Sequence, residues 1–226
     1  MSITYHPAMV QGSDEWHAAR CGMLTASEMD RIITPTLKIA NNDRMRSHVW
    51  EIAAQRISRH VEPSYISDDM LRGWDDETMA RNLYSERIAP VTECGFVTND
   101  DLGFLIGASP DGLVGDAGLI EIKSRRQRFQ VETWATGEVP PEYMLQIQTQ
   151  LFVTGRDWCD FISISPGLPL FVKRIMPSGV WISAICEAAD VFETKVREVC
   201  LAYHANQEAA SPLIATERRP DGEIVL

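Results

Sequence analysis

Two carboxylates and an amine in this chain have a spacing that suits hydrolysis of a phosphodiester. Asp111 lies in the segment Ser109-Pro110-Asp111-Gly112-Leu113, and Glu121 and Lys123 follow it on either side of Ile122. Between them, Gly115-Asp116-Ala117-Gly118 has the composition of a turn joining two apolar runs. The segment is therefore expected to form a β-hairpin.

Alternation along the second strand of this hairpin would group the polar side chains. Ile120 and Ile122 would point into the core, while Glu121 and Lys123 point together to the other face. Asp111, at the start of the opposing strand, can reach the same place. Oxygen ligands of this kind suit Mg²⁺, which keeps several waters and contacts phosphate oxygens. The alternative is a solvated strand face after a common turn, and the motif alone favours that alternative.

The remaining elements must position this hairpin. Helical periodicity and capping signals predict helices at Asp14–Arg20, from near Ser27, at Arg44–His60, Glu77–Ile88, Pro141–Phe152 and Val180–Asn206. Apolar runs predict further strands at Val91–Thr98, Leu102–Ala108, Asp160–Ser165 and Leu170–Met176. This order indicates an α/β fold with a mixed central β-sheet flanked by helices. We expect one domain, with a helical part over about 1–90, a β-rich core over about 91–176 and a C-terminal helix over about 180–206.

Composition limits the class of protein. The chain has 226 residues, 45% of them hydrophobic, and a net charge of −11 from 21 basic and 32 acidic residues. Nucleic-acid binders are usually basic, so the bulk charge argues against a DNA substrate. The local run Lys123-Ser124-Arg125-Arg126-Gln127-Arg128 concentrates positive charge beside the proposed site. That run is either a surface for phosphates or a solvated basic loop, and the sequence favours neither.

The five cysteines are scattered and form no Cys-x-x-Cys pair. This pattern disfavours a disulfide scaffold, a zinc site and an iron–sulfur cluster. The N-terminus shows no signal-peptide pattern, and no apolar run approaches the length of a membrane span. We expect an intracellular, reduced, soluble protein with no membrane partner.

Three further features could serve a phosphodiester-cleaving site. Glu77 is predicted near the start of a helix, where a carboxylate is favourable, and could help to bind a second metal ion. Gln146 and Gln150 lie one turn apart on a predicted helix face, where an amide can bind a phosphate oxygen. The capping box Thr25-Ala26-Ser27-Glu28 would place Ser27 at a helix N-terminus, where Arg20 could join it in holding an anion. Each feature also has an ordinary alternative: a favourable surface acid, a polar helix face, or a capped surface helix.

Taken together, these residues resemble the phage lambda-type alkaline exonucleases, or YqaJ-like viral recombinases, of the restriction-endonuclease-like superfamily. The matching blocks occur in the family order at 11–27, 73–77, 109–113 with 121–123, and at the helix of Gln146. They span roughly residues 11 to 150. The chain beyond about residue 155 carries no motif that we can match.

The resemblance implies a restriction-endonuclease-like fold and a 5′→3′ exonuclease. Such an enzyme digests one strand of linear double-stranded DNA to mononucleotides and leaves a 3′ overhang. It implies two Mg²⁺ ions per active site, with Mn²⁺ as a substitute, and a preference for 5′-phosphorylated ends. It also implies a homotrimeric ring around double-stranded DNA, a single-strand annealing protein of the same phage system as partner, and a place in the cytoplasm of a bacterial host.

Residue roles follow from the same resemblance. Asp111, Glu121 and the backbone carbonyl of Ile122 would bind one Mg²⁺. Asp111 would bridge to a second ion with help from Glu77, and Lys123 would position and help to deprotonate the attacking water. The reaction would be an in-line hydrolysis assisted by two metals.

The same resemblance implies a pocket for the 5′-phosphate. It would consist of Arg20, Ser27, Ser109 and Gln146. We add Thr25, Arg125, Arg126 and Arg128 as candidate DNA contacts. The basic run at 125–128 departs from the pattern we know for the family.

The same residues also allow other interpretations of the function. A structure-specific DNA endonuclease or a catalytically weak DNA-end-binding protein could share the fold, although Asp111, Glu121 and Lys123 are all present. A relative linked to CRISPR adaptation or to a helicase usually carries a four-cysteine iron–sulfur site, which the scattered cysteines disfavour. Four ordered blocks disfavour an unrelated α/β protein.

Overall fold

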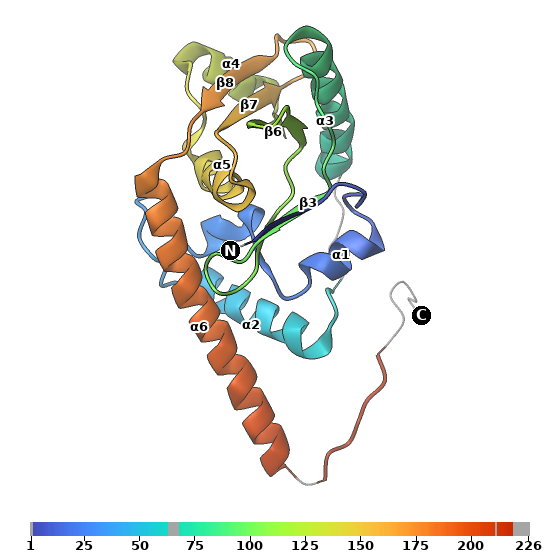
Figure 1. The fold of residues 1–226 in the computed structure, drawn as a ribbon, viewed down its shortest axis with the longest axis vertical. Coiled ribbons are helices and arrows are strands. Elements are labelled where there is room, and N and C mark those ends of the chain that lie inside the picture. The colour runs from blue at the N-terminus through green and yellow to red at the C-terminus, as the bar shows by residue number, and fades with distance from the viewer. Residues whose placement is uncertain (1, 63–67, 211, 219–226) are drawn as a thin grey trace.

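A computed structural model describes residues 2–62, 68–210 and 212–218 (Figure 1). The predicted mixed α/β fold is confirmed, but the strands divide between two four-stranded sheets instead of forming one central sheet. The first sheet contains β1 (Ile3–His6), β2 (Leu24–Thr25), β3 (Phe96–Asn99) and β4 (Ile106–Ala108). The second contains β5 (Gly112–Val114), β6 (Gly118–Ser124), β7 (Trp158–Ile164) and β8 (Phe171–Ile175).

Both sheets mix parallel and antiparallel pairs. The first has the order β1-β3-β4-β2, with β2 parallel to β4 and the other pairs antiparallel. The second has the order β5-β6-β7-β8, with β6 parallel to β7 and the outer pairs antiparallel. β5 and β6 form the hairpin predicted from the turn residues 115–118.

The predicted helices occur in the expected order with some different bounds, and one further helix, α4, was not predicted. They are α1 (Asp14–Arg20), α2 (Asp43–Ser58), α3 (Asp68–Arg87), α4 (Gln127–Thr136), α5 (Pro141–Thr154) and α6 (Gly179–Ala209). The capping box Thr25–Glu28 opens a short 3₁₀ helix, η1 (Ala26–Arg31), with Thr25 as its N-cap. The helix predicted from near Ser27 is therefore six residues long. In addition, β1 and β2 lie within the stretch of about 1–90 that we expected to be helical.

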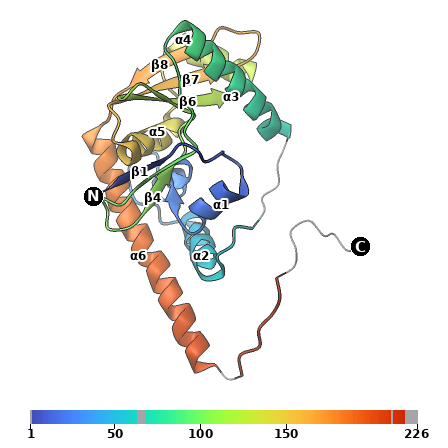
Figure 2. The same ribbon diagram turned by 45° about the vertical axis from the view of Figure 1, so that its right-hand side comes forward.

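Helices cover both faces of β6 (Figures 1 and 2). Ile120 and Ile122 pack with Tyr84 of α3 on one face, and Leu119 packs with Ile147 of α5 on the other. The predicted alternation of β6 is therefore confirmed. The alternative of a solvated polar face is wrong, because the face that carries Glu121 lies beneath α5 and Glu121 is 1% exposed.

Helix α5 connects the two sheets. Its Leu145 and Val153 belong to the core of the first sheet, whereas Ile147 and Leu151 pack on the second. The polar residues between them, Gln148, Thr149 and Gln150, are buried as well. A helix with apolar residues all round is typical of a position inside the protein. Any polar side chain on α5 must therefore find its partner inside the molecule.

Two long helices close the far side of the first sheet. α2 packs against α6, and Arg56 of α2 forms a two-pronged ion pair with Glu193 of α6 at 2.8 and 2.7 Å. Arg56 also donates to the Gly22 carbonyl at 2.7 Å, which ties the loop after α1 to the same pair. Among the described residues, no helix is long and apolar enough to cross a membrane.

Candidate active site

The hairpin places Asp111 opposite the middle of β6. The Asp111 backbone N–H donates to the Ile120 carbonyl at 3.2 Å, and its Oδ2 accepts from the Ile122 backbone N–H at 2.6 Å. Arg81 of α3 donates to the Asp111 carbonyl at 2.8 Å, which fixes the backbone from the other side. Asp111 and Glu121 therefore come together as the sequence predicted.

Glu121 is held by two side chains. Its Oε2 accepts a hydrogen bond from Nε2 of Gln150 on α5 at 2.6 Å. Its Oε1 lies 2.5 Å from Lys123 Nζ in an ion pair, although no hydrogen-bond geometry is satisfied at that oxygen. Lys123 also lies over the Tyr143 ring, 5.6 Å from its centroid. The ammonium thus occupies the space that Glu121 and Asp111 share.

Glu77 reaches the site from the middle of α3. The helix begins at Asp68, so the expectation that Glu77 lies near a helix N-terminus is wrong. The sequence pattern around Gly73 suggested a start there, but the helix continues through it, with a hydrogen bond from Ser124 of β6 to Asp76 at 2.5 Å holding α3 against the strand. Glu77 is half-buried. Its carboxylate interacts electrostatically with both Asp111 and Lys123.

The charges of this acidic cluster, defined as Glu77, Asp111 and Glu121, do not balance against the single ammonium of Lys123. Burial, reinforced by the negative charge of Glu121, raises the pKa of Asp111 well above its usual range. Burial also raises the pKa of Glu77, and Glu121 adds to this while Lys123 opposes it. Burial disfavours the Lys123 ammonium, yet the charges of Glu121 and Asp111 outweigh that effect and raise its pKa. The cluster is thus short of positive charge.

The acidic cluster fits a hard divalent cation that keeps much of its water. No group of three or more His, Cys, Asp or Glu side chains gathers at metal-binding spacing within residues 2–62, 68–210 and 212–218. Mg²⁺ usually needs one or two carboxylates, with waters and substrate phosphates completing its shell. Asp111 and Glu121 can supply those carboxylates, and Glu121 Oε1 has no hydrogen bond. A site of this kind gains its remaining ligands when the substrate arrives.

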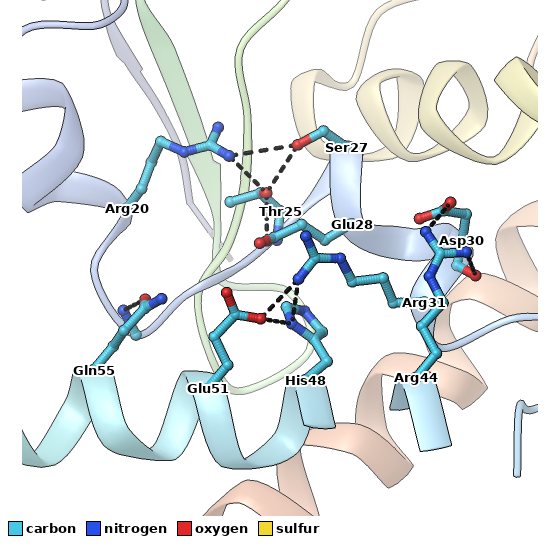
Figure 3. A network of polar contacts seen from close by, with 11 residues as sticks. Arg20, Thr25, Ser27, Glu28, Asp30, Arg31, Arg44, His48, Glu51 and Gln55 are labelled. Atoms are coloured by element: carbon cyan, nitrogen blue, oxygen red, sulfur yellow. Dashed lines mark hydrogen bonds and ion pairs between the residues drawn. The ribbon is translucent and has the colours of Figure 1, made fainter. Parts of the chain in front are cut away.

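A second group of polar residues surrounds Arg20. Arg20 Nη2 donates to Thr25 Oγ1 at 3.0 Å and to Ser27 Oγ at 3.4 Å (Figure 3). Burial lowers the pKa of Arg20 and Glu28 opposes this effect. The guanidinium still carries its charge at neutral pH, because arginine titrates far above it. We call Arg20, Thr25, Ser27 and Ser109 the anion cluster.

Trp16 brings Ser109 into this anion cluster. Its indole N–H donates to Ser109 Oγ at 2.9 Å and to the Gly95 carbonyl at 3.1 Å, while Arg20 stacks on the ring 4.2 Å from its centroid. Sequence reasoning missed this role of Trp16, although the residue lies in the matched block 11–27. The sequence did contain a signal for it, because Trp16 lies one helical turn before Arg20 and an aromatic ring at that spacing can stack on a guanidinium.

The anion cluster and the acidic cluster share two supports. Ser109 precedes Asp111 by two residues in one loop, and Gln146 precedes Gln150 by one turn of α5. α5 also packs against η1, which carries Ser27. Gln146 is half-buried on this helix. The two clusters therefore rest on the same loop and on the same helix.

The three arginines of the basic run 125–128 differ in their exposure and contacts. Arg125 is buried, donates to Thr133 and forms a 3.9 Å ion pair with Glu142, so its expected place in an exposed basic loop is wrong. Its burial follows from α4, which begins at Gln127 and folds back over β7 and β8. Arg126 caps that helix and Arg128 lies on its first turn, both exposed.

Comparisons with known proteins agree on one family. The model of the YqaJ-like viral recombinase domain matches residues 15–157. The crystal structure of an alkaline exonuclease, LHK-Exo, from Laribacter hongkongensis is 35% identical, with a TM-score of 0.76 over 87% of this chain and 98% of that chain. The structure of LHK-Exo in complex with dAMP is 36% identical over the same shares, again with a TM-score of 0.76.

A more distant structure supports the fold alone. A phage-related exonuclease from Haemophilus somnus 129PT is 15% identical, with a TM-score of 0.55 over 80% of this chain and 96% of that chain. No curated protein matches the chain.

The raised pKa of Asp111 predicts that this carboxylate opposes folding of the metal-free protein. Its folded-state pKa lies above the unfolded value of about 3.9, so the penalty is present above the folded pKa and disappears as the pH falls below the unfolded one. At pH 8 with EDTA, Asp111→Asn should raise the free energy of unfolding by about 0.5–2 kcal/mol. Urea unfolding from pH 8 down to pH 4 measures this difference, which should shrink as the pH falls.

Asp116→Asn is the matched control, because Asp116 is exposed on the turn of the same hairpin. Its unfolding should change by less than about 0.5 kcal/mol, as is usual for surface substitutions. A less stable Asp111→Asn protein, or a difference that does not vary with pH, would contradict the proposed electrostatic penalty.

Proposed function

The chain belongs to the YqaJ-like viral recombinase family, and we propose that it is a Mg²⁺-dependent 5′→3′ exonuclease that digests one strand of linear double-stranded DNA. The likeness to the alkaline exonuclease of Laribacter hongkongensis supports a DNA exonuclease. The observation that carries the finer proposal is the pairing of an acidic cluster with an anion cluster on one loop and one helix. That arrangement suits an enzyme that holds a terminal phosphate and cleaves the adjacent bond.

In this proposal the acidic cluster holds the divalent cations. Asp111, Glu121 and the Ile122 carbonyl would hold one Mg²⁺, and Glu77 with Asp111 would hold a second, with Mn²⁺ able to replace either. When bound, these ions would stabilise the negative charge that develops on the phosphate during in-line hydrolysis. Burial raises the pKa values of Glu77 and Asp111, and the charge of Glu121 adds to this. These shifts support the assignment, because a bound cation would offset the cost of keeping the carboxylates charged.

Lys123 acts as a positioning cation in the same proposal. In the metal-free protein, the charges of Glu121 and Asp111 outweigh the effect of burial and raise the pKa of Lys123, so the amine is an ammonium at neutral pH. It can donate hydrogen bonds to the attacking water and to a phosphate oxygen, which holds them together. The expectation that Lys123 also helps to deprotonate the water stays part of the proposal, because bound cations would offset the charges of Glu121 and Asp111 and lower the pKa of the amine.

The anion cluster would receive the 5′-phosphate. Arg20 supplies the charge, while Ser27, Ser109 and Gln146 supply neutral donors around it. Thr25 orients Arg20 through its 3.0 Å hydrogen bond. Arg126 and Arg128, exposed at the start of α4, remain candidate contacts for the DNA backbone, whereas buried Arg125 anchors α4.

The assembly is also a proposal that rests on the family. We propose a homotrimeric ring that encloses a DNA end, a single-strand annealing protein as partner, and action in the cytoplasm of a bacterial host. The product would be duplex DNA with a 3′ single-stranded overhang for recombination. A ring would reconcile a DNA substrate with the net charge of −11, because basic side chains could face the channel while acidic ones face outward.

The test is digestion of linear duplex DNA with Mg²⁺, with each strand labelled internally and with matched 5′-phosphate and 5′-hydroxyl ends. We expect loss of the 5′-terminated strand as mononucleotides, faster from the phosphate. Cuts within circular DNA would indicate an endonuclease instead. Binding to ends without digestion in Mg²⁺ or Mn²⁺ would indicate an end-binding protein.

Lys123→Met should lower the rate of digestion by at least about a hundredfold, as expected for loss of a catalytic group. DNA binding should persist, because methionine keeps the apolar stem against Tyr143. Single-turnover digestion and a gel-shift assay measure the two properties. Wild-type rates from this variant would contradict the role given to Lys123.

Arg20→Ala should remove most of the rate advantage of a 5′-phosphate over a 5′-hydroxyl end, with little further loss on the hydroxyl end. The physical reason is that the guanidinium pairs with a charge that the hydroxyl end lacks. Arg128→Ala, which removes an exposed arginine outside the anion cluster, should keep the ratio between the two ends. Equal losses on both ends for Arg20→Ala would indicate a structural role for Arg20.

A further inference from the structure

Gln150, which the sequence placed beside Gln146 as an amide for a phosphate oxygen, is buried on α5 and contacts the acidic cluster instead. Its side chain is 0% exposed, and Nε2 donates to Glu121 Oε2 at 2.6 Å. The other oxygen of Glu121 faces Lys123 at 2.5 Å. The two oxygens of this buried carboxylate therefore have different partners, a neutral amide on one side and an ammonium on the other.

The amide of Gln150 makes this contact at a cost. Its own Oε1 is buried and has no hydrogen-bond partner among the described residues. An unpaired buried acceptor destabilises the folded protein, and a leucine of similar size at this position would avoid that cost. A polar contact kept in the core at such a cost is typical of a functional site rather than of one that serves stability.

Gln148, two residues earlier on the same helix, shows the structural counterpart. It is also buried, but its Nε2 donates to the Met176 carbonyl at 2.9 Å and its Oε1 accepts from the Ser178 backbone N–H at 2.8 Å. Both halves of this amide are satisfied, and together they attach α5 to the segment between β8 and α6. The same residue type on one helix thus has two different uses.

We infer that Gln150 is a positioning residue that fixes the orientation of the Glu121 carboxylate, so that Oε1 stays directed towards Lys123 and the cation proposed for the site. This inference rests on the proposed function. The charge-assisted hydrogen bond to Oε2 prevents the carboxylate from turning both oxygens towards Lys123. Without Gln150, the ammonium would pair with both oxygens and compete with the cation.

The chemistry of an amide suits this role better than that of a charged group. A lysine or arginine in place of Gln150 would neutralise Glu121 and weaken the attraction for a cation. A carboxylate there would add a further negative charge beside Asp111 and Glu77, whose pKa values burial and the charge of Glu121 already raise. An amide supplies a donor and leaves the charge of the acidic cluster unchanged.

The test compares Gln150→Leu with Gln148→Leu, using Mn²⁺ as the probe and electron paramagnetic resonance to count free Mn²⁺. We expect Gln150→Leu to bind Mn²⁺ about tenfold more weakly or worse, the usual effect of losing a partner of a metal ligand. The Mg²⁺ concentration for half-maximal digestion should rise in parallel, while the rate at saturating Mg²⁺ falls less. Gln148→Leu should unfold at lower urea concentration yet keep wild-type Mn²⁺ affinity.

The possible outcomes distinguish the positioning role of Gln150 from the proposed function. Unchanged Mn²⁺ affinity in Gln150→Leu, or equal weakening in Gln148→Leu, would overturn the positioning role, while digestion by the wild type would leave the proposed function standing. A wild-type protein that binds Mn²⁺ but digests no DNA would overturn the proposed function, and the comparison of affinities would still decide the role of Gln150. Absence of Mn²⁺ binding by the wild type would overturn both. Gln150→Met, which keeps the side-chain length, repeats the comparison if Gln150→Leu does not fold.

Discussion

The structure depends on a carboxylate placed where a carboxylate is costly. Glu121 is on the central strand β6, beneath α5, with 1% of its surface exposed. An isolated buried charge of this kind would be protonated or would destabilise the fold. Here Gln150 and Lys123 contact its two oxygens, and the Ile122 amide holds Asp111 beside it. The hairpin, α5 and α3 can all be understood as supports for this one group.

α5 explains why the two proposed halves of the site stay in register. It packs on both sheets, and it carries Gln146 and Gln150 one turn apart. The loop 109–111 makes the same connection from the other side, since Ser109 contacts Trp16 and Asp111 contacts β6. Because rigid elements position side chains better than free loops do, a bond to be cleaved can be held at a fixed place relative to its terminal phosphate.

The sequence predicted much of this arrangement, and the failures have physical causes. Local signals sufficed for the β5–β6 hairpin, whose turn is marked by glycines, and for α1, α5 and α6. The burial of Glu121 could not be predicted, because alternation along a strand shows which side chains share a face but not which helix covers it. The start of α3 was misplaced for a similar reason, since Gly73 is tolerated within a helix that packs on β6. The burial of Arg125 likewise depends on Thr133 and Glu142, which lie farther along the chain.

The ion pair of Lys123 with Glu121 bears on the order in which the protein folds and binds cations. The ammonium is a counter-ion supplied by the chain itself, so the most buried acid has a partner from the moment β6 forms. A structural zinc domain stays unfolded until its metal arrives. If the protein is the metal-dependent enzyme proposed above, its chain would fold first and take up cations afterwards, so that removal of metal would leave a folded but inactive molecule.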